Sequence, residues 1–300
     1  MFGDMTPWTL FAPLVVDRAA ERRDLDMAHA DAVVVKDGAV LAADGRLVEL
    51  PPHARPEASL TAYLGRDGDR DIVAVVPVDA TFGDADDGIG SERMVGLRDL
   101  LRAFSEIGDA AARDRELAST AVAITTWHAN HPRCSLCGEP TVPIHGGWVR
   151  RCEADEREHY PRTDPAVIVA ITDPEDRLLM AHASYWSARR YSHLAGYVEP
   201  GESLEQAARR EVREEAGITL GALTYVASQP WPFPASIMVG FRASVEDPTL
   251  HLDQDEITEA LWVTREDLPE LVAEGAVILP PAGSIARWML DEWASGGAAH

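Results

Sequence analysis

Three glutamates between residues 211 and 215 have a spacing that brings their side chains together on a helix. Glu211, Glu214 and Glu215 stand at positions i, i+3 and i+4, so in a helix their carboxylates share one face. Like charges at this spacing destabilise an isolated helix, and the cluster therefore calls for compensating cations. Hard divalent ions such as Mg²⁺ or Mn²⁺, which prefer oxygen ligands, would supply that compensation.

The residues around the three glutamates fit a positioned acidic helix. Glu202 falls in the turn before it, and Arg210 is placed to pair with a carboxylate and orient it. Gly217 follows as the residue that ends the helix. Taken alone, the segment EVREE is more typical of a surface helix held by Glu–Arg pairs. The longer pattern around it has to decide between the two interpretations.

The acidic helix, expected over residues 204–216, lies within a region of alternating strands and helices. The segments AVIVAIT and LLMAHA are predicted strands on either side of the turn DPEDR. Further strands follow the helix, and a last helix is expected from Ser284 to Trp293, after the break at Pro280-Pro281. Mixed strands with helices between them indicate a layered α/β/α sandwich with a mixed sheet, which we place at residues 162–300.

The chain before this domain is predicted to be an α+β domain over residues 1–128, which makes the whole chain α+β. Three segments are β-rich: residues 31–36, 40–50 and 71–77. Asp44-Gly45 is a hairpin signal within the second of them. Two later segments have helical spacing: residues 91–104 and 109–129. Nothing in this region has the residue pattern of a catalytic site.

Residues 129–161 have glycines, little periodicity and the three cysteines of the chain. Cys134 and Cys137 form a CxxC pair, and Cys152 follows. Three cysteines cannot form an even disulfide framework, and the CxxC spacing favours a metal site in a reducing compartment. We therefore expect a small metal-stapled module.

The segment SQPWPFPAS, residues 228–236, alternates prolines with aromatic residues. A stiff loop presenting Trp231 and Phe233 would stack a flat base at little entropic cost. The alternative is a proline-broken connection whose aromatic side chains join the core.

The charge balance limits the partners. The formal net charge is −23 at pH 7, which disfavours non-specific binding to nucleic acids or membranes. A phosphate-bearing substrate must then be held by local cations or by bound metal. The first residues do not read as a secretory signal, and no apolar run approaches the roughly 18 residues of a membrane span. We expect a cytoplasmic protein that does not bind membranes.

The segment Gly196–Ile218, GYVEPGESLEQAARREVREEAGI, satisfies every fixed position of the Nudix box, and the chain resembles the Nudix hydrolases. Members of this superfamily hydrolyse a nucleoside diphosphate linked to another group. The resemblance implies that the three glutamates bind catalytic Mg²⁺ or Mn²⁺, with the backbone carbonyl of Ala195 completing the metal shell. Glu202 and Arg210 would support them. Metals would neutralise the diphosphate and acidify a water, whose proton one glutamate takes.

Four further segments, spread over about residues 92–290, resemble the NADH pyrophosphatase (NAD-capped RNA hydrolase) family. They match its patterns SQPWPFPxS, WHxxHxxCxxCG, YPRxDPAVI and PPxGSIA. The resemblance implies a homodimer that hydrolyses NADH, and NAD⁺ less well, to nicotinamide mononucleotide and AMP. In bacterial relatives it also implies removal of NAD caps from RNA.

The same resemblance implies a dinucleotide pocket and a further metal ligand. Eight residues would bind the substrate: Tyr160, Ile168, Tyr197, Gln229, Trp231, Ser236, Met238 and Ala286. Tyr160 and Tyr197 would stack on the nicotinamide. Glu256 matches an additional carboxylate near the metals and is favoured over Glu259; the alternative for Glu256 is an exposed charge where a helix begins.

The cysteine spacing also follows the structural zinc ribbon of this family, with one departure. Asp155 stands where the fourth cysteine is expected, so the implied ligands are Cys134, Cys137, Cys152 and Asp155. Aspartate binds zinc through oxygen and lacks the soft thiolate that makes such sites tight. His159 is an alternative fourth ligand, with His131 and His145 as outside candidates. The other interpretation is a ribbon that has lost its metal and keeps its shape by packing.

Two rival functions remain open at this point. One is a Nudix hydrolase of ADP-ribose or another nucleoside diphosphate derivative, against which the segment SQPWPFPAS argues. The other is a non-catalytic module that senses NAD, against which the complete set of box glutamates argues.

Overall fold

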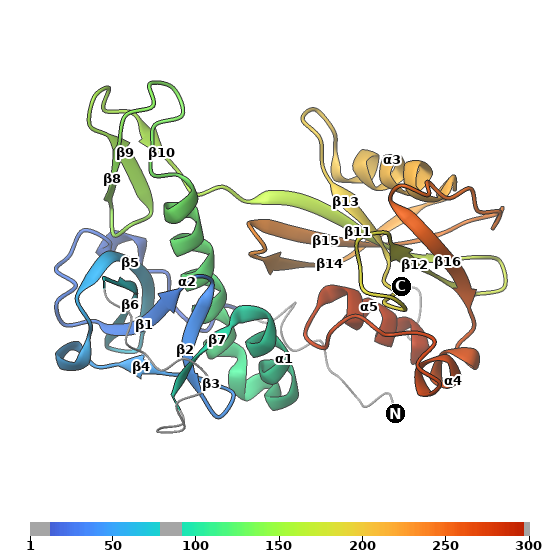
Figure 1. Ribbon diagram of the computed structural model, residues 1–300, viewed down its shortest axis with the longest axis horizontal. Helices are drawn as coiled ribbons and strands as arrows, with labels where there is room; N and C mark the ends of the chain where they lie inside the picture. Colours follow the sequence, from blue (N-terminus) through green and yellow to red (C-terminus); the bar gives the residue numbers. More distant parts are fainter. Residues whose placement is uncertain (1–12, 79–91, 297–300) are drawn as a thin grey trace. The chain divides into compact units, whose positions relative to one another are not determined.

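The computed structural model describes residues 13–78 and 92–296, which fall into two compact units. The N-terminal unit comprises Ala12–Thr163 together with Pro232–Ala235. The C-terminal unit comprises Asp164–Trp231 and the described residues from Ser236 onward. Both units combine sheets with helices, which confirms the predicted α+β class (Figure 1). No helix in the described ranges has both the length and the hydropathy that a membrane crossing needs.

The N-terminal unit has one larger sheet and two helices. Its strands are β1 (Asp31–Lys36), β2 (Ala39–Ala43), β3 (Arg46–Leu47), β4 (Glu49–Leu50), β5 (Ala58–Asp67), β6 (Arg70–Pro77) and β7 (Arg93–Gly96). The sheet has the order β3-β2-β1-β6-β5, with β4 paired to β1 and β7 paired to β2. Helices α1 (Leu97–Ile107) and α2 (Ala112–Asn130) follow. Val34, Tyr63 and Val73 belong to its buried core.

Two predictions for this unit differ in outcome. The hairpin at Asp44-Gly45 is confirmed: both residues have positive φ, 50° and 73°, between paired strands β2 and β3. The helix predicted from Ser91 was wrong at its start. Ser91 lies outside the described residues, and β7 pairs with β2, Val95 opposite Val40, before α1 begins at Leu97. Pairing with a distant strand overrode the local helical spacing.

The cysteine region forms a small ribbon of three strands: β8 (Thr141–Ile144), β9 (Val149–Cys152) and β10 (Glu158–His159), in the order β10-β9-β8. Buried Arg150 donates hydrogen bonds to Thr141 Oγ1 at 2.6 Å and to His128 Nδ1 at 2.7 Å. Because a guanidinium only donates, Nδ1 accepts, and His128 Nε2 carries the proton that it donates to the Gly147 carbonyl at 2.7 Å. The end of α2 is thus tied to the ribbon.

The C-terminal unit is built on a six-stranded mixed sheet. Its strands are β11 (Asp164–Thr172), β12 (Leu178–Ala183), β13 (Leu194–Tyr197), β14 (Leu223–Trp231), β15 (Ser236–Ser244) and β16 (Ile257–Val263). The order is β14-β15-β11-β12-β16, with β13 paired to β11. Strands β11 and β15 are parallel over nine residue pairs, and the other pairings are antiparallel. Its helices are α3 (Leu204–Ala216), α4 (Asp267–Ala273) and α5 (Ile285–Ala294).

Strand β11 shows how the two faces of this sheet are covered. Val167 and Val169 are buried in a cluster with residues of α3, whereas Ile168 is buried in a second cluster with residues of α5. Successive side chains of a strand point to opposite faces, so the two helices cover opposite faces. Figure 1 shows α3 and α5 on the two sides of the sheet. The predicted α/β/α sandwich is confirmed.

The segment SQPWPFPAS contains more strand than its prolines suggested. Strand β14 continues to Trp231 and β15 begins at Ser236, so only residues 232–235 connect the two strands. Trp231 pairs with Ser236 and Gln229 with Met238. Pro230 is tolerated within β14 because that strand lies at the edge of the sheet. The prediction of a loop over all nine residues was wrong.

Candidate active site

Helix α3 begins and ends as its sequence predicts. The backbone N–H of Gln206 donates to Ser203 Oγ at 3.1 Å, and the N–H of Ser203 donates to Gln206 Oε1 at 2.8 Å, forming a capping box. At the other end Gly217 has φ 71°, a left-handed conformation that favours glycine. These ends set which residues of the helix face the sheet.

Strand β13 contacts α3 through a position that only glycine can occupy. A Cβ atom at Gly196 would lie 2.0 Å from Cδ of Glu211. The Glu211 carboxyl group therefore packs against the backbone of Gly196, and burial raises its pKa. The first glycine of the box thus makes room for the first glutamate of the cluster.

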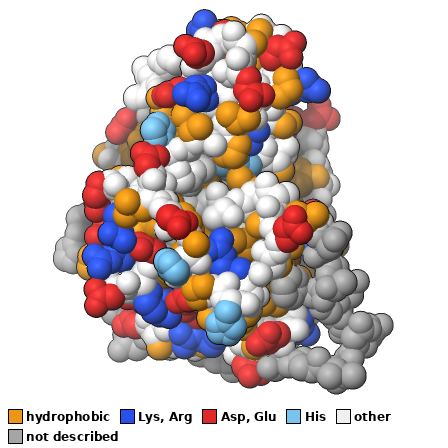
Figure 2. Space-filling model, turned by 90° about the vertical axis from the view of Figure 1, so that its left-hand side faces the viewer, with side chains coloured by type: hydrophobic (Ala, Val, Ile, Leu, Met, Phe, Trp, Pro, Cys, Tyr) orange, Lys and Arg blue, Asp and Glu red, His pale blue; other side chains and the backbone are white. Residues whose placement is uncertain are grey.

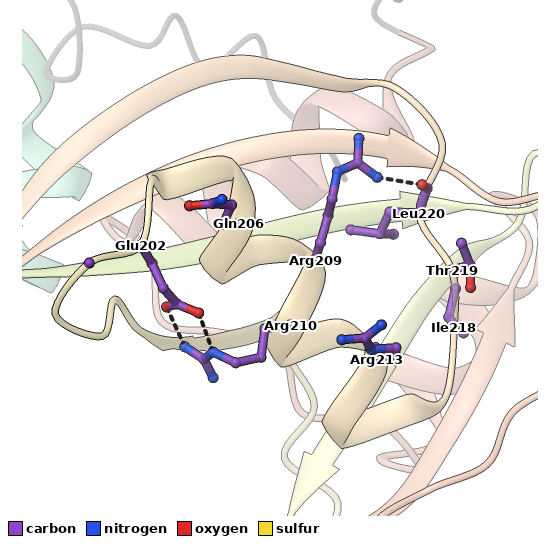
Figure 3. A pocket seen from close by; sticks show the side chains of 9 residues that line it. Glu202, Gln206, Arg209, Arg210, Arg213, Ile218, Thr219 and Leu220 are labelled. Atoms are coloured by element: carbon purple, nitrogen blue, oxygen red, sulfur yellow. Dashed lines mark hydrogen bonds and ion pairs between the residues drawn. The ribbon is translucent and has the colours of Figure 1, made fainter.

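Arg210 binds three carboxylates of the site. Its guanidinium donates to Glu202 from Nε at 2.6 Å and from Nη2 at 2.9 Å, the two-pronged pairing visible in Figure 3. Its Nη1 lies 2.9 Å from Glu211 Oε1 and 3.0 Å from Glu214 Oε2. The hydrogen bonds from Arg210, and next that from the Glu199 N–H, lower the pKa of Glu202 to about 2. The predicted pairing of Arg210 with box carboxylates is thus present in the geometry.

Glu215 is the buried member of the cluster, with 7% of its surface exposed. Within the described chain its Oε2 atom has no hydrogen-bond partner. Burial, then the negative charges of Glu211 and Glu256, raise the pKa of Glu215 to about 8, against a hydrogen bond from the Ala195 backbone. Glu256 itself is exposed and immediately precedes β16, so the alternative of a charge at a helix start was wrong.

This arrangement fits a hard divalent cation. Carboxylate oxygens are the donors that Mg²⁺ and Mn²⁺ prefer, and a buried carboxyl oxygen without a partner gains most from such a neighbour. Glu214 is the more exposed member, with 57% of its side chain accessible. Glu259 accepts a hydrogen bond from the Tyr191 hydroxyl at 2.5 Å and is engaged there. The negative charges of Glu214 and Glu256 both act on Glu211 and on Glu215, so these four carboxylates are coupled by charge.

Four of the residues predicted to bind substrate lie on the α5 side of the sheet. Ile168 and Ala286 are buried there, and Met238 is partly buried against them. Gln229 donates from Nε2 to the Gly283 carbonyl at 2.8 Å and accepts from the Ile285 N–H at 2.7 Å. Gln229 thus fixes the segment before α5.

The other four are distributed differently. The Tyr197 hydroxyl lies 3.2 Å from Ser236 Oγ, and Tyr197 is 51% exposed. Trp231 is partly exposed at the end of β14. Tyr160 belongs to the N-terminal unit, is 64% exposed and donates to Glu158 Oε2 at 2.5 Å. Seven of the eight residues therefore belong to the C-terminal unit, and Tyr160 belongs to the N-terminal unit.

The ribbon gathers a second group of ligands. The ligand atoms of Cys134, Cys137, Cys152 and Asp155 all lie within 4.8 Å of one another. Backbone N–H groups of Cys137 and Leu136 lower the pKa of Cys134 to about 7, whereas burial raises the pKa of Cys152 to about 11. Three thiol groups and a carboxylate at this spacing fit zinc. His131 and His145 bond elsewhere, to the Trp127 carbonyl and to Asp24.

Comparisons with known proteins agree with both clusters. The NUDIX domain model matches residues 162–281, and the NADH pyrophosphatase zinc ribbon domain model matches residues 129–160. The chain is 38% identical over 273 residues to the NAD-capped RNA hydrolase NudC of Mycobacterium bovis, covering 88% of this chain and 83% of that one. The chain belongs to the NADH pyrophosphatase family of Nudix hydrolases. It is therefore an enzyme, an NAD(H) pyrophosphatase of the Nudix hydrolase class.

Other members of the family and its superfamily are more distant. The human NAD-capped RNA hydrolase NUDT12 is 33% identical over 193 residues, 60% of this chain and 42% of that protein. A crystal structure of a NUDIX hydrolase from Nitrosomonas europaea has a TM-score of 0.45 at 20% identity, covering 54% of this chain and 90% of that one.

Several contacts at the site had no signal in the sequence. Tyr191 bonds Glu259 across 68 residues, and Gln229 reaches the segment before α5 across more than 50. Fully buried His193 lies 3.1 Å from the carbonyl of Ala286 through Nε2. Tyr191 and His193 lie between β12 and β13, and a lone tyrosine or histidine there predicts nothing by itself, so only the folded chain reveals these partners.

Proposed function

We propose that the chain hydrolyses the diphosphate bond of NADH and NAD⁺, releasing AMP and reduced or oxidised nicotinamide mononucleotide, and that it removes NAD caps from RNA. The observation that carries this proposal is the buried Glu215 carboxyl, whose Oε2 has no partner in the described chain and which is coupled by charge to Glu211, the partner of Arg210, within a chain of this family. The curated relatives are named for hydrolysis of NAD-capped RNA, which supports a dinucleotide substrate.

Glu211, Glu214 and Glu215 would hold the catalytic Mg²⁺ or Mn²⁺, with Glu256 and the carbonyl of Ala195 as further ligands. When bound, such cations neutralise the diphosphate oxygens and acidify the attacking water. Arg210 orients Glu211 and Glu214 through its guanidinium, and Glu202 holds Arg210 in turn. The chain thereby fixes the geometry of its carboxylates before substrate arrives.

A proton must leave the attacking water, and Glu215 is the group we assign to accept it. Burial and neighbouring negative charge raise the pKa of Glu215 to about 8 before any cation binds, so its carboxylate, once deprotonated, accepts a proton more readily than that of an exposed glutamate. Packing of α3 against β13 keeps bulk water away from the carboxyl group.

The dinucleotide itself is assigned to the eight residues that the family resemblance implies. Ile168, Met238 and Ala286 offer an apolar surface on the α5 side of the sheet, which suits a flat base. Trp231 and Tyr197 offer aromatic faces, and Ser236 a hydroxyl beside Tyr197. Gln229 positions the segment before α5, and Tyr160 is retained as a nicotinamide-stacking residue.

We assign the ribbon cluster as a structural zinc site with Cys134, Cys137, Cys152 and Asp155 as ligands. The support is the mutual approach of four ligand atoms and the absence of any catalytic arrangement around them among the described residues. Zinc would fix the ribbon without taking part in hydrolysis.

The same proposal includes a homodimer in the cytoplasm and a division at residues 1–128, 129–161 and 162–300. The family models at 129–160 and 162–281 support the two later boundaries. Sedimentation of the purified chain would measure the oligomeric state.

One assay tests the proposed reaction. Purified protein is incubated with Mg²⁺ or Mn²⁺ and, separately, with NADH, NAD⁺, ADP-ribose or ATP, and the products are identified by mass spectrometry. We expect AMP and reduced nicotinamide mononucleotide from NADH, with no turnover in excess chelator. Turnover of ADP-ribose without turnover of NADH would refute the assignment, as would tight NADH binding with no product.

A further inference from the structure

A cavity of about 530 Å³ lies along α3, and it is lined both by Glu202 and Arg210 of the proposed active site and by residues that the proposed hydrolysis does not use. Its walls come from α3 and from the segment after it, residues 218–220. Gln206, Arg209 and Arg213 line it at helical spacing, together with Arg210, Glu202 and Thr219 (Figure 3). Three arginines thus face one carboxylate. That excess of positive charge is notable in a chain with a net charge of −23.

The three arginines differ in how their charge is compensated. Arg210 is neutralised by its carboxylate partners. Among the described residues, Arg209 donates only to two backbone carbonyl oxygens. These are the carbonyl of Leu220 and, at 2.8 Å, the carbonyl of Gly221. Exposed Arg213 has no ion pair within residues 13–78 and 92–296. Two cations therefore face this cavity without a carboxylate.

Arg209 and Arg213 stand four residues apart, which on an isolated helix is destabilising for like charges. An anion between them would remove that repulsion, as divalent cations do for the glutamates of α3. Several polar donors complete the wall. Gln206 uses its Oε1 in the capping box, which leaves its amide N–H groups, and Thr219 adds an exposed hydroxyl. Arginine forks and amide donors are the groups that recognise phosphate oxygens.

We propose that this cavity binds a backbone phosphate of the RNA chain that continues from the adenosine of a capped substrate. The inference rests on the proposed function, because the same helix would carry the metals that hold the cap diphosphate. Figure 2 shows acidic and basic side chains interspersed on a face of the N-terminal unit, which does not include α3. The net charge of −23 repels RNA, so a phosphate of the RNA chain requires local cations such as Arg209 and Arg213.

Arg213→Glu tests the site without disturbing α3, because the Arg213 side chain has no described partner to lose. The control is Arg102→Glu, which makes the same charge change at an exposed position of α1. Hydrolysis of NADH and of an NAD-capped RNA decamer is measured for both variants. We expect Arg213→Glu to raise KM for the capped RNA by roughly five- to tenfold, as loss of one charge pair predicts, with NADH kinetics unchanged. Arg213→Lys keeps the positive charge and should therefore leave KM for the capped RNA close to that of the unmodified enzyme.

A binding measurement separates this inference from the proposed reaction. Fluorescence anisotropy with an uncapped, 5′-phosphorylated RNA decamer needs no catalysis. The slope of log Kd against log salt concentration should fall by about 0.7 in Arg213→Glu, the loss of one phosphate contact on a single strand. Equal weakening by Arg102→Glu, an unchanged slope, or equal loss on NADH and capped RNA would overturn the proposal. Failure of NADH hydrolysis in the unmodified enzyme would instead refute the proposed function.

Discussion

The chain contains two regions suited to metal ions, and they differ in almost every physical respect. The ribbon brings four ligand atoms to within 4.8 Å of one another, three of them sulfur, with no partner for catalysis among the described residues. The site on α3 offers oxygen atoms only, and its charges are shared with Arg210. A preassembled, soft cluster suits a structural ion, whereas an open set of hard donors leaves room for substrate and water.

The two regions differ in the interactions that their ligand residues make before a metal ion binds. In the ribbon the ligands are close because short strands and turns place them, and Asp155 also pairs with Arg157. On α3, Arg210 already pairs with Glu202, Glu211 and Glu214, so an approaching cation replaces existing interactions. Substitutions should therefore affect catalysis at one site and stability at the other.

Glu215→Gln should have the largest effect. The substitution removes the charge and the proton acceptor from the buried carboxyl position, and we expect the rate of NADH hydrolysis to fall by about 10³-fold or more. The melting temperature near neutral pH should change little, because a carboxyl group with a pKa of about 8 is largely protonated there and glutamine has a similar size. Glu205→Gln, at an exposed position in the first turn of α3, is the matched control. Retention of more than a tenth of the rate would remove Glu215 from the mechanism.

Gly196→Ala should come next. The added Cβ would lie 2.0 Å from Cδ of Glu211, so the carboxyl group must move. Displacement of a catalytic group by about 1 Å costs about 10²-fold in rate. Steady-state kinetics with Mn²⁺ titration should show weaker metal activation. Unchanged metal dependence would mean that Glu211 is not a ligand.

Arg210→Ala should reduce activity by about 10- to 100-fold, the range typical of residues that support metal ligands. Glu202 would lose the partner that holds its pKa at about 2, and Glu211 and Glu214 would lose their orientation. Arg210→Lys should recover only part of the rate, because lysine cannot form the two-pronged bond to Glu202. Full recovery would show that only charge matters.

Asp155→Cys should change zinc binding by the ribbon without changing hydrolysis. A fourth thiolate should increase zinc affinity by at least roughly tenfold, measured by competition with a chromophoric chelator. The kcat for NADH should not change, since the ribbon takes no part in hydrolysis. A large change in kcat would show that the ribbon affects hydrolysis and would contradict the separation of the two regions.

The smallest effect concerns the packing beneath the ribbon. Burial, with the charge of Arg150, lowers the pKa of His128 to about 4, whereas an unfolded histidine has a pKa of about 6.5. The unfolded chain therefore binds a proton first as pH falls. The stabilisation is complete above about pH 6.5 and is lost towards pH 4. Urea unfolding from pH 7 to pH 4.5 should show a shallower decline for His128→Gln, and an identical decline would contradict this assignment.

Sequence patterns predicted those parts of the molecule that depend on local chemistry. The terminal glycine Gly217 is a local signal, and α3 runs from Leu204 to Ala216 as expected. The box glutamates and Arg210 could be placed on it for the same reason. The contact between the Glu211 carboxyl group and the backbone of Gly196 could not be predicted in this way, because it depends on the packing of β13 against α3.

Distant pairing accounts for what the sequence did not predict. Residues 93–96 have helical spacing, yet they pair with β2 as a strand. Prolines 230 and 232 suggested a loop, yet strand pairing continues to Trp231 because β14 lies at a sheet edge. In both cases the decisive contact is made by residues far away in the chain, which no local pattern contains.

The alternation along β11 has a consequence for insertions and deletions. Its odd-numbered residues pack on the side of α3 and its even-numbered residues on the side of α5. Removing one residue within the strand would turn every later side chain to the other side. A deletion before Ile168 would then turn this proposed substrate-binding residue away from the face on which Met238 and Ala286 pack. A codon lost from residues 232–235, which only join two strands, would leave that alternation untouched.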